Sequence, residues 1–150
     1  MLRSKTSATP GTDDMALIYL DSCLLIYACE AHPLFGPLTL AAMARKQPEE
    51  QFAISPLTCM ECLVKPLHSG NMGLQRYYES SFACFTWLPL HDEVFDIAAK
   101  LRARHGLRTP DALHLACALH HDCQAMWTNG DRLTAAGHGF VSNVLKADRD

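Results

Sequence analysis

Short apolar segments alternate with longer, helix-length segments along the chain, and this alternation constrains the fold most. The predicted strands are LIYL (17–20), QFAIS (51–55), FTWLPL (85–90, a strand or an extended turn), AMWT (125–128) and GFVS (139–142). The predicted helices end near Cys29, run from Pro56 to about Leu67, and cover about 37–46, 72–83, 92–105, 110–121 and 131–136. Strands that alternate with helices favour a parallel sheet covered on both faces. We therefore expect an α/β fold with a mostly parallel central sheet of four to five strands flanked by helices.

The chain has 150 residues, of which 49% are hydrophobic and 19% are charged, as expected for one globular domain with a sizeable core. Residues 1–14 are mostly small and polar, which predicts a flexible leader before a domain over 15–150, with Met15 as an alternative start. This leader lacks the apolar core of a signal peptide, and no apolar stretch is long enough to predict a membrane span. The formal net charge of -3 gives no overall attraction to nucleic acid, so any such contact requires a local basic patch.

Seven cysteines, an odd number, lie mostly among apolar neighbours, where a free thiol behaves as a small hydrophobe. This usage predicts a reducing, cytoplasmic compartment. Cys59 and Cys62 form a C-x-x-C pair, but a structural zinc site needs two further ligands. His120, His121 and Cys123 lie too far along the chain to complete a familiar zinc finger. We therefore expect buried or half-buried free thiols.

Four acidic residues map to one edge of the predicted sheet. They are Asp21 at the end of the first strand, Glu61 in the first turns of the helix after the second strand, Asp111 at the start of TPDALHLACAL, and Asp131 in TNGD after AMWT. In a parallel α/β sheet, the carboxyl ends of the strands and the N-termini of the following helices gather along one edge, where ligands usually bind. The sequence therefore predicts an acidic cluster at this edge.

An acid near a helix N-terminus also has a purely structural interpretation, because the helix dipole favours it by about 0.3–1 kcal/mol. Asp21 would then N-cap the helix that follows it. Glu61 would close a capping box with Thr58, unless the helix begins after Ser55 and leaves Glu61 further inside.

The other two acids have equally simple interpretations. Asp111 would be a first-turn acid behind Thr109 as the cap, and Asp131 would belong to an N-G-D turn. Taken together, however, carboxylates that converge at an apolar-walled edge would raise one another's pKa unless a cation lies among them. Carboxylate and water oxygens suit Mg²⁺ or Mn²⁺ rather than zinc. Such a site favours metal-assisted hydrolysis of a phosphodiester.

Four segments, in this order, resemble a known family: IYLDSCLLIY, ISPLTCMECL, RTPDALHLACAL and MWTNGDRL. Over residues 16–141 they resemble the PIN domain nucleases, and most closely the VapC-type toxins of bacterial toxin–antitoxin pairs. The resemblance implies one PIN-like domain and a Mg²⁺-dependent endoribonuclease, with Mn²⁺ as an alternative metal. It also implies that the catalytic, metal-binding residues are Asp21, Glu61 and Asp111, with a fourth acid near the end of the fourth strand.

The fourth acid departs from the family pattern. Family members usually place it two residues after the threonine, where this chain has Gly130, whereas Asp131 stands three residues after Thr128. We expect Asp131 to serve as the fourth metal-binding and catalytic acid through a shift of the loop, with Asn129 sharing the role or simply forming the turn. Ser22 and Thr128 would orient a carboxylate or a metal-bound water by hydrogen bonding, or would serve as ordinary helix-cap and strand-end residues.

The densest basic segment, KLRARHGLR (100–108), runs directly into Asp111. Arg102, Arg104 and Arg108 are therefore candidates to bind RNA phosphates beside the metal. The structural alternative is an exposed helix whose basic last turn complements its dipole. His114, one turn after Asp111, is expected to be a partly buried helical histidine.

The segments LFGPLTLAAMARK and GLQRYYESSFACF place more apolar side chains on helices than a small core needs. They would pack in the core, or bind an antitoxin helix or a second copy of the chain. The family resemblance implies a homodimer, a cognate antitoxin whose tail covers the acidic site, and an RNA substrate, with tRNA as one candidate.

Two alternative functions follow from the same residues. A catalytically weak PIN-like module that binds RNA or protein is one alternative, because the fourth acid is out of register. A phosphoaspartyl phosphatase is disfavoured, because Cys23 stands where its second acid would be.

Overall fold

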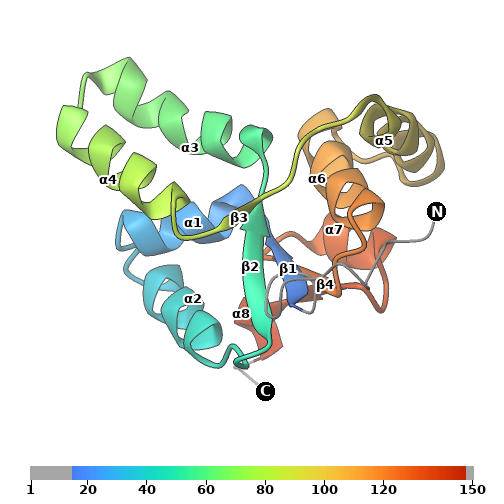
Figure 1. Cartoon of the computed structure of the whole chain (residues 1–150), viewed down its shortest axis with the longest axis horizontal. Coiled ribbons are helices and arrows are strands. Elements are labelled where there is room, and N and C mark those ends of the chain that lie inside the picture. Colours follow the sequence, from blue (N-terminus) through green and yellow to red (C-terminus); the bar gives the residue numbers. More distant parts are fainter. Residues whose placement is uncertain (1–14, 148–150) are drawn as a thin grey trace, which may run out of the picture.

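The computed structural model describes residues 15–147 (Figure 1). The strands are β1 (Ala16–Leu20), β2 (Glu50–Ile54), β3 (Thr86–Trp87), β4 (Ala125–Thr128) and β5 (Val141–Asn143). The helices are α1 (Ser22–Cys29), α2 (Phe35–Ala44), α3 (Pro56–Ser69), α4 (Met72–Phe82), α5 (Asp92–His105), α6 (Thr109–His120), α7 (Asp131–Ala136) and α8 (Val144–Ala147). The predicted leader, residues 1–14, lies outside the described residues. No helix within 15–147 is long and apolar enough to cross a membrane.

The strands form one five-stranded sheet in the order β3-β2-β1-β4-β5, and every pairing is parallel. This confirms the predicted α/β fold and makes its sheet entirely parallel. The central strand β1 pairs with β2 on one side and β4 on the other, with Ile18 opposite both Phe52 and Ala125. Chain order therefore reverses between β1 and β4, and a crevice for ligands opens at the carboxyl ends of strands at such a point.

Alternate residues of β1 enter two separate cores, because successive side chains of a strand point to opposite faces. Ile18 and Leu20 pack with buried residues of α1, α3 and α4. Tyr19 packs with buried residues of α5, α6 and α7. Figure 1 shows the corresponding layers, with α1 to α4 on one side of the sheet and α5 to α7 on the other. Both faces of the sheet are thus covered, as a parallel sheet requires.

Several element boundaries differ from the prediction, and one short helix was not predicted. Strand β3 has only two residues, and Pro89, which lacks the N–H needed for strand pairing, follows soon after it. Helix α2 begins at Phe35 rather than residue 37, because proline is tolerated in the first turn. The short helix α8 was not predicted, and Asn143 begins it by accepting hydrogen bonds from the backbone N–H groups of Leu145 and Lys146.

All seven cysteines are free thiols. Six are buried or half-buried as expected, whereas Cys84 is exposed, in the turn between α4 and β3. Burial raises the pKa of Cys59 to about 11 and also raises that of Cys62. In the metal-free chain both thiols therefore keep their protons at neutral pH and pack as small apolar groups.

Candidate active site

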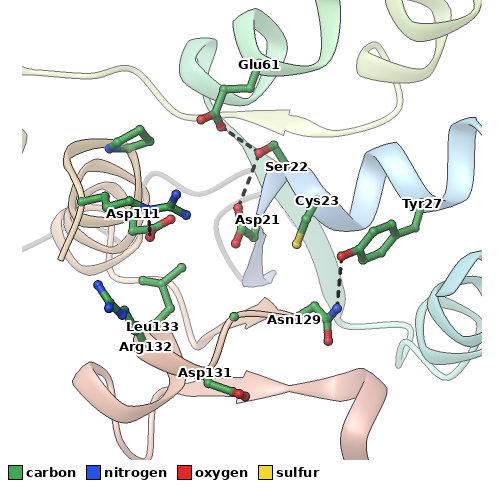
Figure 2. Close-up of a pocket in the computed structure, with 13 residues that line it drawn as sticks. Asp21, Ser22, Cys23, Tyr27, Glu61, Asp111, Asn129, Asp131, Arg132 and Leu133 are labelled. Carbon is green, nitrogen blue, oxygen red and sulfur yellow. Dashed lines mark hydrogen bonds and ion pairs between the residues drawn. The ribbon is translucent and has the colours of Figure 1, made fainter. Parts of the chain in front are cut away.

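An open pocket of about 800 Å³ lies at the carboxyl edge of the sheet, where β1 and β4 end (Figure 2). Side chains from the starts of α1 and α6, from α3 and from the β4–α7 loop line it. All four acids expected at this edge are among the lining residues: Asp21, Glu61, Asp111 and Asp131. Parallel topology thus gathers acids that lie as much as 110 positions apart in the sequence.

Asp21 occupies the N-cap position of α1, with extended backbone angles of φ -64° and ψ 145°, yet its side chain makes no capping hydrogen bond. Its Oδ2 instead accepts a hydrogen bond of 2.7 Å from the buried Thr128 hydroxyl, and its Oδ1 lies 3.5 Å from Ser22 Oγ. A cap would turn the carboxylate toward its own helix. Here the carboxylate is turned into the pocket and is held from the neighbouring strand.

Glu61 lies one turn beyond the start of α3. Ser55 is the N-cap of this helix, and Thr58 rather than Glu61 completes its capping box. The Glu61 carboxylate is therefore not used in capping and accepts a hydrogen bond of 2.7 Å from Ser22 Oγ. His114 Nε2 lies 2.6 Å from the same oxygen, Oε1. Burial would raise the pKa of Glu61, but the hydrogen bond and charge of His114, with the Ser22 hydrogen bond, lower it overall.

His114 belongs to a buried hydrogen-bond chain that ends at Glu61. The ring is 1% exposed, and its Nδ1 lies 2.6 Å from the hydroxyl of Tyr19, which in turn lies 2.8 Å from Ser55 Oγ. Because a carboxylate only accepts, Nε2 carries the hydrogen that His114 shares with Glu61. Burial raises the pKa of Tyr19, so its hydroxyl stays protonated. His114 is thus fully buried, and Tyr19 is a site-supporting residue that the sequence analysis missed.

Asp111 lies in the first turn of α6, whose N-cap is Arg108 rather than the predicted Thr109. Arg108 Nε lies 3.5 Å from Asp111 Oδ2. Burial and the negative charge of Asp21 raise the pKa of Asp111, and Arg108 offsets only part of this effect. A raised pKa between two acids marks a place where a cation would be favourable.

Asp131 lines the rim of the pocket rather than its floor. It is the first residue of α7, its side chain is 75% exposed, and its Oδ1 lies 3.0 Å from Lys146 Nζ. Figure 2 shows its carboxylate pointing away from Asp21. The carboxylates of Asp21, Glu61 and Asp111 face the interior of the pocket, whereas that of Asp131 is paired with α8.

The residues around the strand ends make defined contacts. Thr128 donates to Asp21 and accepts a hydrogen bond of 2.9 Å from the backbone N–H of Gly130. Asn129 lines the pocket and donates to the hydroxyl of Tyr27 at 3.1 Å. Ser22 lies between Asp21 and Glu61. Thr128 and Ser22 therefore position carboxylates directly.

The basic residues divide into two groups. Arg108 and Arg132 line the pocket. Arg102 lies outside the pocket lining, and its Nε donates to the backbone carbonyl of Leu107 at 2.9 Å, next to the C-cap of α5. Arg104 is exposed in the same last turn. The contact of Arg102 therefore agrees with the alternative in which the basic last turn of α5 serves the helix end. Arg108, in contrast, lines the pocket and is well placed to meet an anionic ligand.

The donor set of the pocket fits a hard divalent cation, because three carboxylates surround a partly buried space. Within residues 15–147, the only group of three or more potential ligands whose donor atoms all lie within 4.8 Å of one another is elsewhere, at His91, His120 and His121. The pocket carboxylates are thus spread more widely. A divalent cation held by one or two carboxylates directly, and by the others through water, would fit this arrangement.

The fold and the pocket define a class of protein, a parallel α/β domain with an acidic site at the carboxyl edge of its sheet. The family model described as PIN domain matches residues 18–139. The chain therefore belongs to the PIN domain family.

Solved structures share this fold at low sequence identity. A toxin–antitoxin complex from Klebsiella pneumoniae is similar with a TM-score of 0.69 and 22% identity, covering 86% of this chain and 97% of that one. VapC20 of Mycobacterium tuberculosis, described as a sarcin–ricin loop cleaving toxin, is similar with a TM-score of 0.69 and 16% identity. The match covers 83% of this chain and 96% of that one. FitAcB from Neisseria gonorrhoeae is similar with a TM-score of 0.68 and 21% identity, and the match covers 85% of this chain and 97% of that one. A search of curated proteins found no match.

Proposed function

We propose that this chain is a Mg²⁺-dependent endoribonuclease that acts as the toxin of a toxin–antitoxin pair. The observation that carries the proposal is the convergence of Asp21, Glu61 and Asp111 in one pocket of a PIN domain. Asp131 is assigned as a fourth acid that contributes from the rim when it leaves Lys146.

A bound Mg²⁺ or Mn²⁺ would supply an activated water and neutralise charge that develops on the phosphodiester. Asp21, Glu61 and Asp111 would hold the ion. Ser22 and Thr128 fix two of these carboxylates by hydrogen bonds, which reduces the reorganisation needed on binding. His114 fixes Glu61 from the buried side.

RNA would enter along the basic side of the pocket. Arg108 and Arg132 line it and are placed to pair with phosphates next to the scissile bond. Arg102 and Arg104 lie further out, in the last turn of α5, and would add to the attraction of the RNA backbone without touching the reacting phosphate. One of the solved structures with this fold is described as a sarcin–ricin loop cleaving toxin, which supports an RNA substrate.

The biological role is proposed from the solved structures with the same fold, which include one described as a toxin–antitoxin complex and one described as a member of the VapBC family of toxin–antitoxin systems. A cognate antitoxin would silence this chain, and the chain would form a homodimer. Apolar side chains on α2, α3 and α4 that exceed half exposure offer surfaces for both contacts: Leu40, Met60, Val64, Leu67, Met72 and Tyr77. The free thiols favour the reducing cytoplasm as its compartment.

The direct test is cleavage of a mixed pool of tRNA and structured RNA by the purified protein with Mg²⁺ or Mn²⁺. We expect discrete cuts that disappear with EDTA and in the Asp21→Asn variant, whose carboxamide keeps the shape of the side chain. Asp131→Asn is expected to reduce cleavage far less than Asp21→Asn, because its side chain points to the rim.

The alternative is a PIN-like module that binds RNA or protein without cutting. The pairing of Asp131 with Lys146 favours it, because this pairing leaves one acid outside the cluster. RNA binding without metal-dependent cleavage by the folded wild-type protein would support the module and contradict the nuclease.

A further inference from the structure

We propose a second metal site, for zinc or another imidazole-preferring transition metal, formed by His91, His120 and His121. One ring nitrogen from each residue lies within 4.8 Å of the other two. The three ring centroids are 4.9 to 5.6 Å apart, so the imidazoles form a closed triangle.

The geometry is close to that of a bound ion. With Zn–N distances of about 2.0–2.1 Å, nitrogen ligands in a tetrahedral site lie roughly 3.3 Å apart. The nitrogens, which lie within 4.8 Å of one another, would therefore have to move closer by side-chain rotation to share one ion. Three protein ligands would leave the fourth tetrahedral position to water, as in other zinc sites with three histidines.

His121 already has the second contact that metal-binding histidines usually make. Its Nε2 lies 2.7 Å from the backbone carbonyl of Pro89, so Nε2 carries the hydrogen and Nδ1 keeps the lone pair.

The metal site would connect the N-terminal end of α5 to the C-terminal end of α6. His91 is the N-cap of α5, whereas His120 is the last residue of α6 and His121 its C-cap. The two helices are connected at their other ends by the short segment 106–108, and Figure 1 shows them side by side. A metal at the three histidines would therefore clamp the α5–α6 hairpin.

The histidine site is separate from the acidic pocket and prefers a different metal. Helix α6 has 12 residues, which at 1.5 Å per residue places its two ends about 18 Å apart, with Asp111 near one end and His120 at the other. Imidazole nitrogens suit zinc, copper and nickel, whereas carboxylates and water suit Mg²⁺ and Mn²⁺. Zinc binding here neither requires nor replaces the proposed nuclease metal.

The test is a titration of the metal-free full-length protein with ZnCl₂ in competition with a chelating dye, in excess Mg²⁺ to occupy the acidic pocket. We expect one zinc per chain and a rise in the midpoint of thermal unfolding on binding. His91→Gln and His120→Gln should each weaken zinc binding at least about tenfold and abolish the thermal shift. His138→Gln, at an exposed histidine after α7, and Asp21→Asn should leave zinc affinity unchanged.

His91 is exposed, so its variant is expected to fold, and circular dichroism would verify this. Equal zinc affinity in the wild type and the folded His91→Gln variant would overturn the proposal. Loss of zinc binding in Asp21→Asn but not in His91→Gln would also overturn it, because that result would assign the zinc to the acidic pocket.

Discussion

Asp21 and Asp111 share one pocket, so the charge of Asp21 affects the pKa of Asp111. Burial and the Asp21 charge raise the pKa of Asp111, while Arg108 acts in the opposite sense. A proton on Asp111 competes with a metal ion, and this carboxyl keeps its proton to a higher pH than an ordinary aspartate does. Mg²⁺ affinity should therefore weaken as the pH falls through the pKa of Asp111.

Two substitutions should move this pKa in opposite directions. Asp21→Asn removes a negative neighbour and should lower the pKa of Asp111. Arg108→Gln removes a positive neighbour and should raise it further. Carbon-13 NMR titration of the side-chain carboxyls, without divalent cations, measures both shifts. Shifts in the same direction would contradict this account of the pocket electrostatics.

The buried contact between Tyr19 and His114 should contribute measurably to stability. Tyr19→Phe keeps the ring but leaves His114 Nδ1 and Ser55 Oγ without their shared partner. An unsatisfied buried polar group costs about 1–3 kcal/mol, so the free energy of unfolding should fall by that amount. Urea denaturation measures it.

The matched control is Tyr77→Phe, because Tyr77 is 55% exposed. Its unfolding free energy should change by less than about 0.5 kcal/mol. Equal effects of the two substitutions would show that the buried hydroxyl makes no special contribution.

At the level of single residues, the sequence predicted the acids and, as one of two interpretations, the hydrogen bonds of Ser22 and Thr128 to carboxylates, but not the buried partner of Glu61. Asp21 and Asp111 could be placed because strand ends and helix starts are local signals. The chain from Tyr19 through His114 to Glu61 joins residues 95 and 53 positions apart, and no local pattern encodes such contacts. The direction of the Asp131 side chain depends on Lys146 in α8, a helix that was itself not predicted.

The β4–α7 loop is the element at which this chain departs from its family pattern. Gly130 is the N-cap of α7 and has ordinary extended angles, φ -95° and ψ 126°. A Cβ there would meet only Thr128 Oγ1, at 3.4 Å. The position therefore accepts a side chain and lines the pocket.

Gly130→Asp should therefore tighten Mg²⁺ binding, because it adds a carboxylate at the usual family position. Gly130→Asn is the control, since both residues cap α7 and should stabilise the protein by a few tenths of a kcal/mol at most, but only aspartate adds charge. Calorimetric Mg²⁺ titration compares the two variants. Equal Mg²⁺ affinity would show that this loop does not reach the metal.

Most elements were predictable because apolar periodicity and capping residues are local. Helix α5 ends at His105, and its C-cap is Gly106, whose φ of 67° suits glycine. A glycine after a run of helical periodicity can be recognised in the sequence as a helix end. Strand β3 was less predictable, because its two residues pair only with the end of β2 and this pairing is a tertiary contact.

At the scale of the whole molecule, apolar surface on α3 bears on assembly. Met60, Val64 and Leu67 follow helical spacing, and each is more than half exposed. If this face contributes to the proposed homodimer, Val64→Lys should shift the protein from dimer toward monomer in light scattering after size exclusion. Lys65→Arg, a neighbouring change that keeps the charge, should leave the mass unchanged. A wild-type monomer at all accessible concentrations would contradict the dimer.

The proposed nuclease requires that the acidic pocket bind a divalent metal ion. The most direct measurement is anomalous X-ray diffraction from crystals of this protein grown with Mn²⁺. We expect an anomalous peak bound by Asp21, Glu61 and Asp111, directly or through water, and its loss in Asp21→Asn crystals. The absence of any peak in this pocket at saturating Mn²⁺ would contradict it.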